Sequence, residues 1–239
     1  VRDLFDSMMR GYPIGYLMLW ECPSLDKKKS IGVDAHSYDS PKEVIIDGQQ
    51  RLTSLYAVMK GKKVINSKFD EKSIVISYCP LQNKFEVGYQ ATKNDPEWIY
   101  NISDLFTSTN TFKFIGDFIK KLGDYRSTKG SELTDEEQGL IADRINSVVN
   151  LKSHTLPVFD IKSTAEEEDV SEIFVRVNSG GVSLKQNDFI LTLLSLYWDD
   201  GRREIEQFSK DSTAPAKGKT TSYNQLTTVS AQDVIRVVM

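Results

Sequence analysis

The feature that most constrains this chain is a change of hydrophobic period within a few residues. Val44 to Ile46 is a run of β-branched residues, which is typical of a strand. Beyond Gly48, apolar residues recur at helical spacing, and they are Leu52, Leu55, Tyr56 and Met59. The segment therefore predicts a strand, a glycine turn and a helix. Such a turn favours an anion, because the first N–H groups of the helix and the positive end of its dipole point at it.

The turn itself carries the chemistry of a phosphate site, in the order Asp47, Gly48, Gln49, Gln50 and Arg51. Arg51 can grip a phosphate with a fork of donors, Gln49 or Gln50 can hold a water or a phosphate oxygen, and Asp47 can hold magnesium. Phosphoryl transfer needs these parts. A structural alternative is open: Asp47 with Gln50 is a variant capping box, Gly48 is a turn residue, and Arg51 is a solvated cation.

The rest of the pattern predicts an α+β fold. We expect a helix that ends at Gly11, a strand over residues 16–20, a hairpin over 74–87 and helices over 98–150, the second of them capped by Thr134 and Glu137. A further strand covers 155–161, and the residues expected to be buried in it are Leu156, Val158 and Ile161. Helices capped by Thr164 with Glu167 and by Ser183 with Gln186 follow, and then a mobile loop over 209–223.

Composition excludes several classes of protein. The 239 residues carry a net charge of −4, so no overall positive field exists for non-specific nucleic-acid binding. Cys22 and Cys79 have neither metal-site spacing nor the number that a disulfide framework needs, so we expect a reducing cytoplasm. The sequence shows no membrane span and no signal-peptide pattern. Because it starts at Val1 within a helical pattern, we interpret it as a fragment.

The string from Val44 to Leu55, VIIDGQQRLTSL, resembles the DGQQR signature of the GmrSD-type restriction endonuclease N-terminal domain family, also described as ParB-like or sulfiredoxin-like. Residues 7–15, SMMRGYPIG, resemble the opening helix and turn of that family. Residues 98–105, WIYNISDL, resemble its middle, and residues 173–181, IFVRVNSGG, with Leu184 resemble its second signature. The resemblance therefore spans almost the whole chain.

The resemblance implies a ParB/sulfiredoxin-like mixed sheet core in which Asp47, Gly48, Gln49, Gln50 and Arg51 form a nucleotide-phosphate site. Members of the family act in bacterial defence against foreign DNA. They bind or hydrolyse nucleoside triphosphates (NTPs), some sense modified DNA, and a separate C-terminal nuclease domain cuts. Within the site we assign Arg51 to phosphate, Gln49 or Gln50 to water, and Asp47 to magnesium. Replacing Arg51 by Ala is expected to abolish NTP hydrolysis and to leave the thermal melt nearly unchanged.

The second signature supplies two further candidates, Arg176 and Asn178. The functional interpretation places them at the edge of the nucleotide pocket or of a nucleic-acid groove, as the resemblance suggests. The alternative is structural, because an arginine at the edge of an apolar stripe often covers core and an asparagine before Gly-Gly is a common C-terminal cap.

We expect a ParB-like α/β core over residues 1–163 with a helical insertion at about 98–150, and a helical segment over 164–239 that is truncated at the C-terminus. The favoured function is an NTP-binding and hydrolysing module of a restriction or phage-defence protein, which gates a nuclease outside this fragment. One alternative is a non-catalytic module that binds DNA or modified DNA, and another is a ParB-like fold that itself acts as a DNA nuclease.

The expected partners are DNA, a nuclease domain or subunit, and a second copy in a homo-oligomer, with no membrane. DNA would be contacted by local basic features or by the missing C-terminal part, and Lys210, Lys217 and Lys219 are the candidates because acids are scarce around them. His154 lacks the acidic neighbour of a nuclease motif, and His36 has no second histidine nearby, so neither is assigned to a metal.

Overall fold

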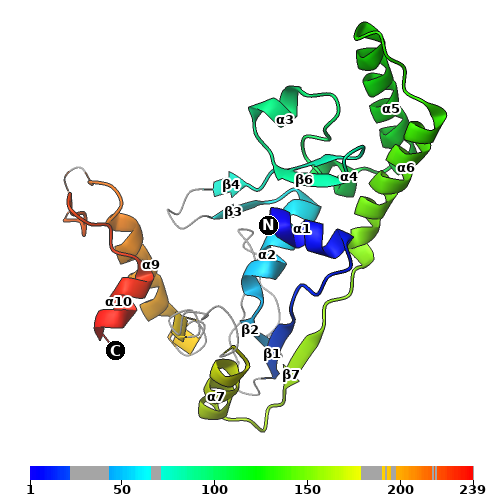
Figure 1. Cartoon of the computed structure of the whole chain (residues 1–239). Coiled ribbons are helices and arrows are strands. Elements are labelled where there is room, and N and C mark those ends of the chain that lie inside the picture. Colours follow the sequence, from blue (N-terminus) through cyan, green and yellow to red (C-terminus); the bar gives the residue numbers. More distant parts are fainter. Residues whose placement is uncertain are drawn as a thin grey trace. The chain divides into compact units, whose positions relative to one another are not determined.

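The computed structural model describes residues 1–21, 43–65, 71–178, 190–191, 193–194, 198–216, 218 and 220–238 (Figure 1). The elements along these residues mix helices and strands, which confirms the α+β class. Their bounds are α1 Arg2–Met9, β1 Leu17–Glu21, β2 Glu43–Asp47, α2 Gln49–Lys60, β3 Lys63–Ile65, β4 Glu71–Ser73, β5 Ile76–Cys79, β6 Lys84–Val87, α3 Gln90–Asn94, α4 Ser103–Thr107, α5 Thr111–Thr128, α6 Asp135–Asn150, β7 Val158–Ile161, α7 Glu167–Asn178, α9 Asp199–Asp211 and α10 Ala231–Val238, with a 3-10 turn at Leu151–Ser153.

The chain forms two compact units, and each is built from separate stretches of sequence. The first unit contains Val1–Tyr16, Gly48–Val64 and Glu71–Pro157. The second contains Leu17–Asp47, Ile65–Asp70 and Val158–Met239. The division into residues 1–163 and 164–239 that we expected from the sequence stays a prediction.

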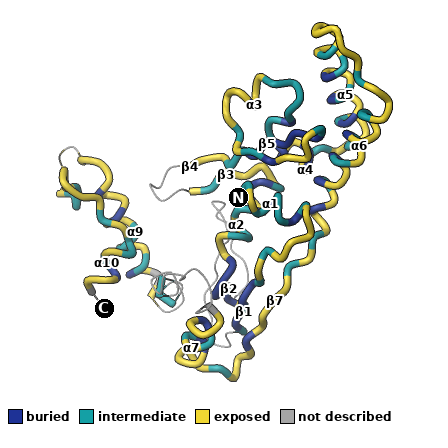
Figure 2. Tube along the Cα trace, viewed as in Figure 1, coloured by how far each residue is buried: buried dark blue, intermediate teal, exposed yellow. Residues whose placement is uncertain are grey.

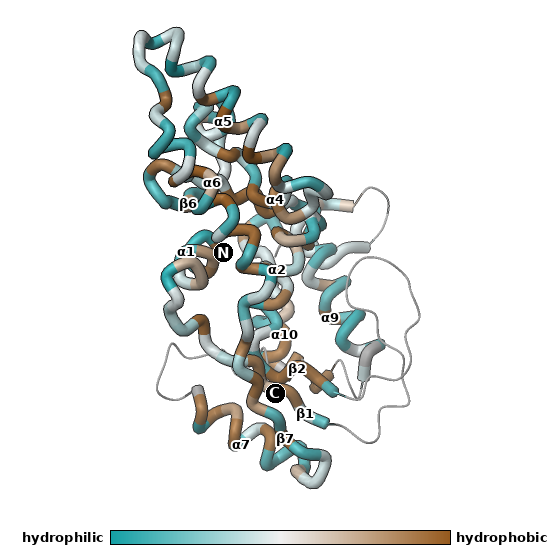
Figure 3. Tube along the Cα trace, turned by 90° about the vertical axis from the view of Figure 1, so that its right-hand side faces the viewer, coloured by the Kyte–Doolittle hydropathy of each residue, from teal (hydrophilic) through white to brown (hydrophobic). Residues whose placement is uncertain are grey.

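The first unit has one apolar core, to which α1, α2, the β5–β6 hairpin and α4 to α6 contribute (Figure 2). Phe5 lies between the rings of Phe85 and Phe106, at centroid distances of 6.3 and 6.1 Å. Hydrophobic and hydrophilic residues alternate along α5 (Figure 3), and its buried residues are Ile115, Phe118 and Leu122. These residues recur at helical spacing, so one side of α5 packs on the core.

The second unit contains a three-stranded mixed sheet in the order β2-β1-β7. Strand β1 pairs antiparallel with β2 and parallel with β7. Its burial pattern makes Leu17, Met18 and Trp20 core residues. Strand β7 supplies Ile161 to that core, but Val158 is 52% exposed, so the expectation that Val158 is buried was wrong. Val158 lies at the start of an edge strand, where one neighbour is missing.

Two predicted boundaries in the second unit also need correction. Helix α7 begins at Glu167, so Thr164 lies outside it, and the carboxylate of Asp169 accepts a hydrogen bond from the Glu166 N–H instead. The predicted loop over 209–223 overlaps the end of α9, where Ser209 and Ser212 are buried. Both hydroxyls donate to the Val229 carbonyl, at 2.8 and 3.1 Å, because a buried hydroxyl needs a partner.

Several sequence predictions fall on residues outside the described part of the chain. They concern Cys22, His36, the glycines after Asn178, Leu184, the Ser183–Gln186 cap, Lys217 and Lys219. Over the residues that the structure does describe, no helix is long and apolar enough to cross a membrane.

Candidate functional site

The glycine turn of the DGQQR sequence lies between β2 and α2, as its period predicted. Strand β2 ends at Asp47, and Gly48 is the N-cap of α2 with φ 92° and ψ 2°. This left-handed backbone favours glycine, because a Cβ would crowd the following carbonyl. The N-cap residue is glycine and supplies no side chain, and the alternative capping box of Asp47 and Gln50 stays a prediction. The ladder of the helix begins with the Leu52 N–H bonding the Gly48 carbonyl, so the N–H groups of Gln49 and Gln50 lie outside it.

The first turn of α2 differs in charge from those of α6 and α7. It contains no acidic residue, whereas the first turn of α6 and that of α7 contain three each. Acidic side chains in a first turn offset the positive end of the helix dipole. In α2 the charged side chain of the first turn is Arg51, which adds to the dipole instead of opposing it. This combination favours an anion at the start of α2.

The guanidinium of Arg51 is fixed by the loop that follows α1. Its Nη2 donates a hydrogen bond to the Tyr16 carbonyl at 2.5 Å. Gly15, which has φ +86°, lies against the same group: a Cβ at Gly15 would stand 3.1 Å from Nη1 and 3.3 Å from Cζ of Arg51. The missing side chain of Gly15 therefore leaves room for the guanidinium. Two sequence signatures that are far apart in the chain, residues 7–15 and the DGQQR string, thus meet at Arg51.

Sequence reasoning assigned no role to Gly15 or Tyr16. The signal was present in the string Gly11-Tyr-Pro-Ile-Gly15, where a second glycine follows the one that ends the helix. Its meaning depends on a tertiary contact, because only the folded chain brings Gly15 against Arg51.

The five DGQQR residues differ in accessibility. Asp47 is 7% exposed at the end of the sheet strand, where its backbone pairs with Met18. Gln49 and Gln50 are exposed, and Arg51 is half-buried. The glutamines can therefore meet a ligand in solvent, while Arg51 is held by the Tyr16 carbonyl. The magnesium role of Asp47 stays a prediction.

The described part of the second signature, residues 173–178, lies on α7, in the second unit. Arg176 is exposed and pairs with Glu172, one helical turn before it. It lines a hollow of about 370 Å³ together with Thr164, Asp169 and Ile173. The described part of α7 runs to Asn178, and the predicted break at the glycines after it lies outside the described residues. The pocket-closing role of Arg176 and Asn178 stays a prediction.

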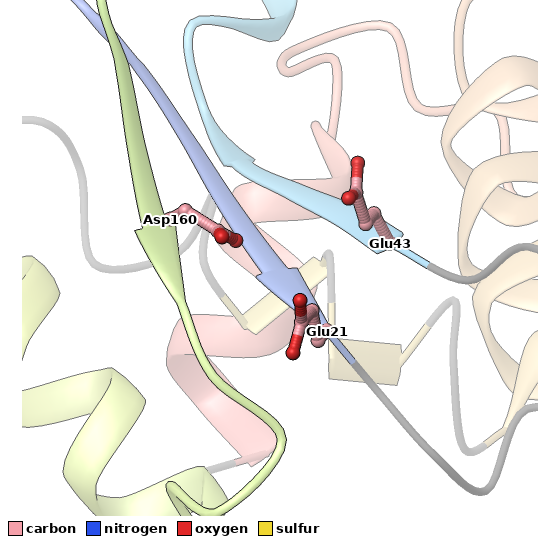
Figure 4. A group of neighbouring side chains, drawn as sticks. All are labelled: Glu21, Glu43 and Asp160. Atoms are coloured by element: carbon pink, nitrogen blue, oxygen red, sulfur yellow. The ribbon is translucent and has the colours of Figure 1, made fainter.

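A group of three carboxylates lies at the sheet of the second unit (Figure 4). Glu21 on β1, Glu43 on β2 and Asp160 on β7 have oxygens within 4.8 Å of one another. The Lys162 ammonium lies among them, 2.9 Å from Glu21 and 2.5 Å from Asp160. Hydrogen bonds to Asp160 and to Glu21 raise the pKa of Lys162 above its ordinary value. Glu21 and Glu43 face each other across the strands, and like charges there repel, so Lys162 offsets that repulsion.

Comparison with known proteins identifies the family of the chain. The GmrSD restriction endonuclease N-terminal domain family matches residues 1–195, which include α1, the DGQQR turn and α7. The chain therefore belongs to this family. It is part of a restriction, or phage-defence, protein. A search of curated proteins finds no similar sequence.

Proposed function

We propose that this chain is an NTP-binding and hydrolysing module of its restriction system, with the phosphates held at the start of α2. The observation that carries the proposal is the construction of this helix end. Gly48 caps it without a side chain, its first turn contains no acid, and Arg51 is fixed there by Tyr16. Positive charge and outward N–H groups at one point are what a triphosphate requires.

The roles within the site follow from accessibility. The exposed amides of Gln49 and Gln50 contact phosphate oxygens or orient the attacking water, since both can donate and accept hydrogen bonds. Arg51 supplies a fixed positive charge. Asp47 contributes one carboxylate toward magnesium, which suits that ion because phosphates and waters usually complete its octahedral shell.

The function requires partners beyond the described residues. A restriction endonuclease acts on DNA, so we infer that the nucleotide state of this module gates a nuclease domain or subunit. Arg176 and Asn178 on α7 are proposed as further contacts to the nucleotide or to the nucleic acid.

The central test replaces Arg51 and measures phosphate release from each NTP, with magnesium, in the presence and absence of DNA. Arg51→Lys keeps the charge but loses the fork that bonds the Tyr16 carbonyl, so we expect at least a tenfold loss of turnover. Arg51→Ala should abolish it. The bond to Tyr16 changes our expectation for stability: Arg51→Ala should also cost about 1–2 kcal/mol of unfolding free energy.

Arg144→Ala is the matched control for that loss of stability. Arg144 lies in the same unit, and its Nη1 donates to the carbonyls of Pro80 and Leu81 at 2.8 and 2.7 Å. Its replacement should lower the melting temperature to a similar extent and leave phosphate release unchanged. Turnover that survives in Arg51→Ala, or that falls equally in Arg144→Ala, would contradict the proposed site.

A further inference from the structure

The segment that contains α2 has a local charge opposite to that of the whole protein. From Gly48 to Phe69 the sequence contains no acidic residue and five basic ones, in a chain whose net charge is −4. Four of the five are within described residues: Arg51, Lys60, Lys62 and Lys63.

Four exposed residues of α2 form one stripe along the helix axis. Gln49, Thr53, Tyr56 and Lys60 follow one another at steps of four, three and four residues, which places them on one face. All four are exposed. The opposite side of the helix packs inward, where Leu55 and Val58 are buried. The stripe spans about 16 Å, at 1.5 Å per residue.

Two further exposed lysines follow the C-terminal end of the stripe. Gly61 ends α2 with a left-handed backbone, and Lys62 and the β3 residue Lys63 follow as exposed residues. Lys63 pairs with Glu71 of β4 at 3.5 Å, and both side chains are at least half exposed. Such an exposed pair is weak and screened by salt, so Lys63 can exchange Glu71 for a phosphate. We call Thr53, Tyr56, Lys60, Lys62 and Lys63 the α2 strip.

The strip has the chemistry of a site for single-stranded nucleic acid. Tyr56 is 52% exposed, although a large aromatic ring normally gains by burial. Sites for unpaired strands combine a positive track for the backbone with aromatic rings on which bases stack. Tyr56 and Lys60 on one helix face, with the exposed Lys62 and Lys63 directly after the helix, supply both parts. The bases of a closed duplex, in contrast, do not offer their faces to a ring.

We propose that the α2 strip binds a single polynucleotide strand, with one base stacked on Tyr56 and the backbone running along Lys60, Lys62 and Lys63. This inference concerns a surface beyond the start of α2 and does not require that an NTP be hydrolysed. It assigns the contact with nucleic acid to a rigid helix face, in addition to the Lys210, Lys217 and Lys219 segment that the sequence suggested.

The test measures binding of a fluorescein-labelled 15-nucleotide oligo-dT to the whole chain by fluorescence anisotropy, in EDTA and without nucleotide. These conditions make the result independent of the proposed NTP site. Tyr56→Ala should weaken binding about tenfold, and Tyr56→Phe, which keeps the ring, should restore most of it. Lys60→Gln with Lys62→Gln should reduce the slope of log affinity against log salt by about 1.4, since each single-strand phosphate contact contributes about 0.7.

The matched control is Lys120→Gln with Lys121→Gln, which removes two exposed lysines from α5 in the same unit. It should leave both affinity and salt slope unchanged, and thermal melts should show that every variant is folded. The proposal is overturned if Tyr56→Ala binds as well as the original chain, if the control pair has the same effect, or if a closed duplex hairpin binds more tightly than oligo-dT.

Discussion

At the scale of single residues, the contact between Gly15 and Arg51 explains why two distant sequence signatures belong to one site. Gly15 has φ +86°, and a Cβ there would lie 3.1 Å from a guanidinium nitrogen. Gly11 also has a positive φ, of +67°, but a Cβ there would meet no atom within 4 Å. The two glycines therefore share the backbone requirement and differ in the close contact.

Gly15→Ala should therefore damage both stability and function. The positive φ alone should cost about 1–3 kcal/mol, and the new methyl group should also push Arg51 away from the Tyr16 carbonyl. We expect lower stability in urea denaturation and at least a tenfold loss of NTP turnover. Gly11→Ala should lose stability through the backbone only and keep its turnover. Equal turnover in the two variants would show that Gly15 does not position Arg51.

The sequence could predict the residues of the turn but not the contacts that hold Arg51 in place. The turn at Gly48 follows from the change of period after Asp47, and glycine permits the left-handed backbone that the structure has there. The contacts of Gly15 and Tyr16 with Arg51 could not be predicted, because no local pattern indicates which distant carbonyl a guanidinium will bond.

At the scale of elements, α6 shows how local rules determine a helix end. Thr134 and Glu137 form the capping box that the sequence predicted, with bonds of 3.2 and 3.0 Å. Glu137 also accepts from Arg126 of α5 at 2.9 Å, so the same carboxylate joins two helices. The short strands β3 and β4 and the helices α3 and α9 were not predicted, because β3, β4 and α3 are too brief to show a period and α9 contains few apolar residues.

This junction predicts a pH dependence. The Thr134 N–H and the Arg126 guanidinium hold the pKa of Glu137 below its ordinary value. The folded chain therefore binds this proton less readily than the unfolded chain, so the stabilisation is present above the ordinary pKa and is lost as pH falls through the lowered one. As the pH falls from about 6 to about 3, the melting temperature of Glu137→Gln should decrease less than that of the original chain.

Glu136→Gln is the control for this comparison, because it removes a neighbouring charge from the same helix turn. It should follow the original chain across the titration. A pH profile of Glu137→Gln that matches the original chain would show that the junction contributes no pH-dependent stability.

At the scale of the whole molecule, the chain passes several times between two compact units. The sheet of the second unit joins β1 and β2 to β7, which is far along the sequence, and α7 buries Val170 and Phe174 in the same unit. A large part of this unit therefore depends on residues beyond the predicted boundary at 163.

Truncation tests this dependence. We expect a fragment of residues 1–163 to melt at a lower temperature than the full chain, because it lacks the apolar residues of α7. Extending the fragment to Asn178 should recover part of that loss, and Phe174→Ala in the longer fragment should remove the gain, at a cost of about 3–5 kcal/mol for a buried ring. A fragment of 1–163 that melts like the full chain would support the division predicted from the sequence.

The sequence by itself determined the local chemistry of this protein. The hydrophobic period and the glycine predicted a strand, a glycine turn and a helix at Val44 to Met59, because each depends only on neighbouring residues. Only the tertiary structure decided which groups hold Arg51 and which face of α2 meets solvent. Those features depend on packing between distant segments, and no short pattern in a single chain specifies such contacts.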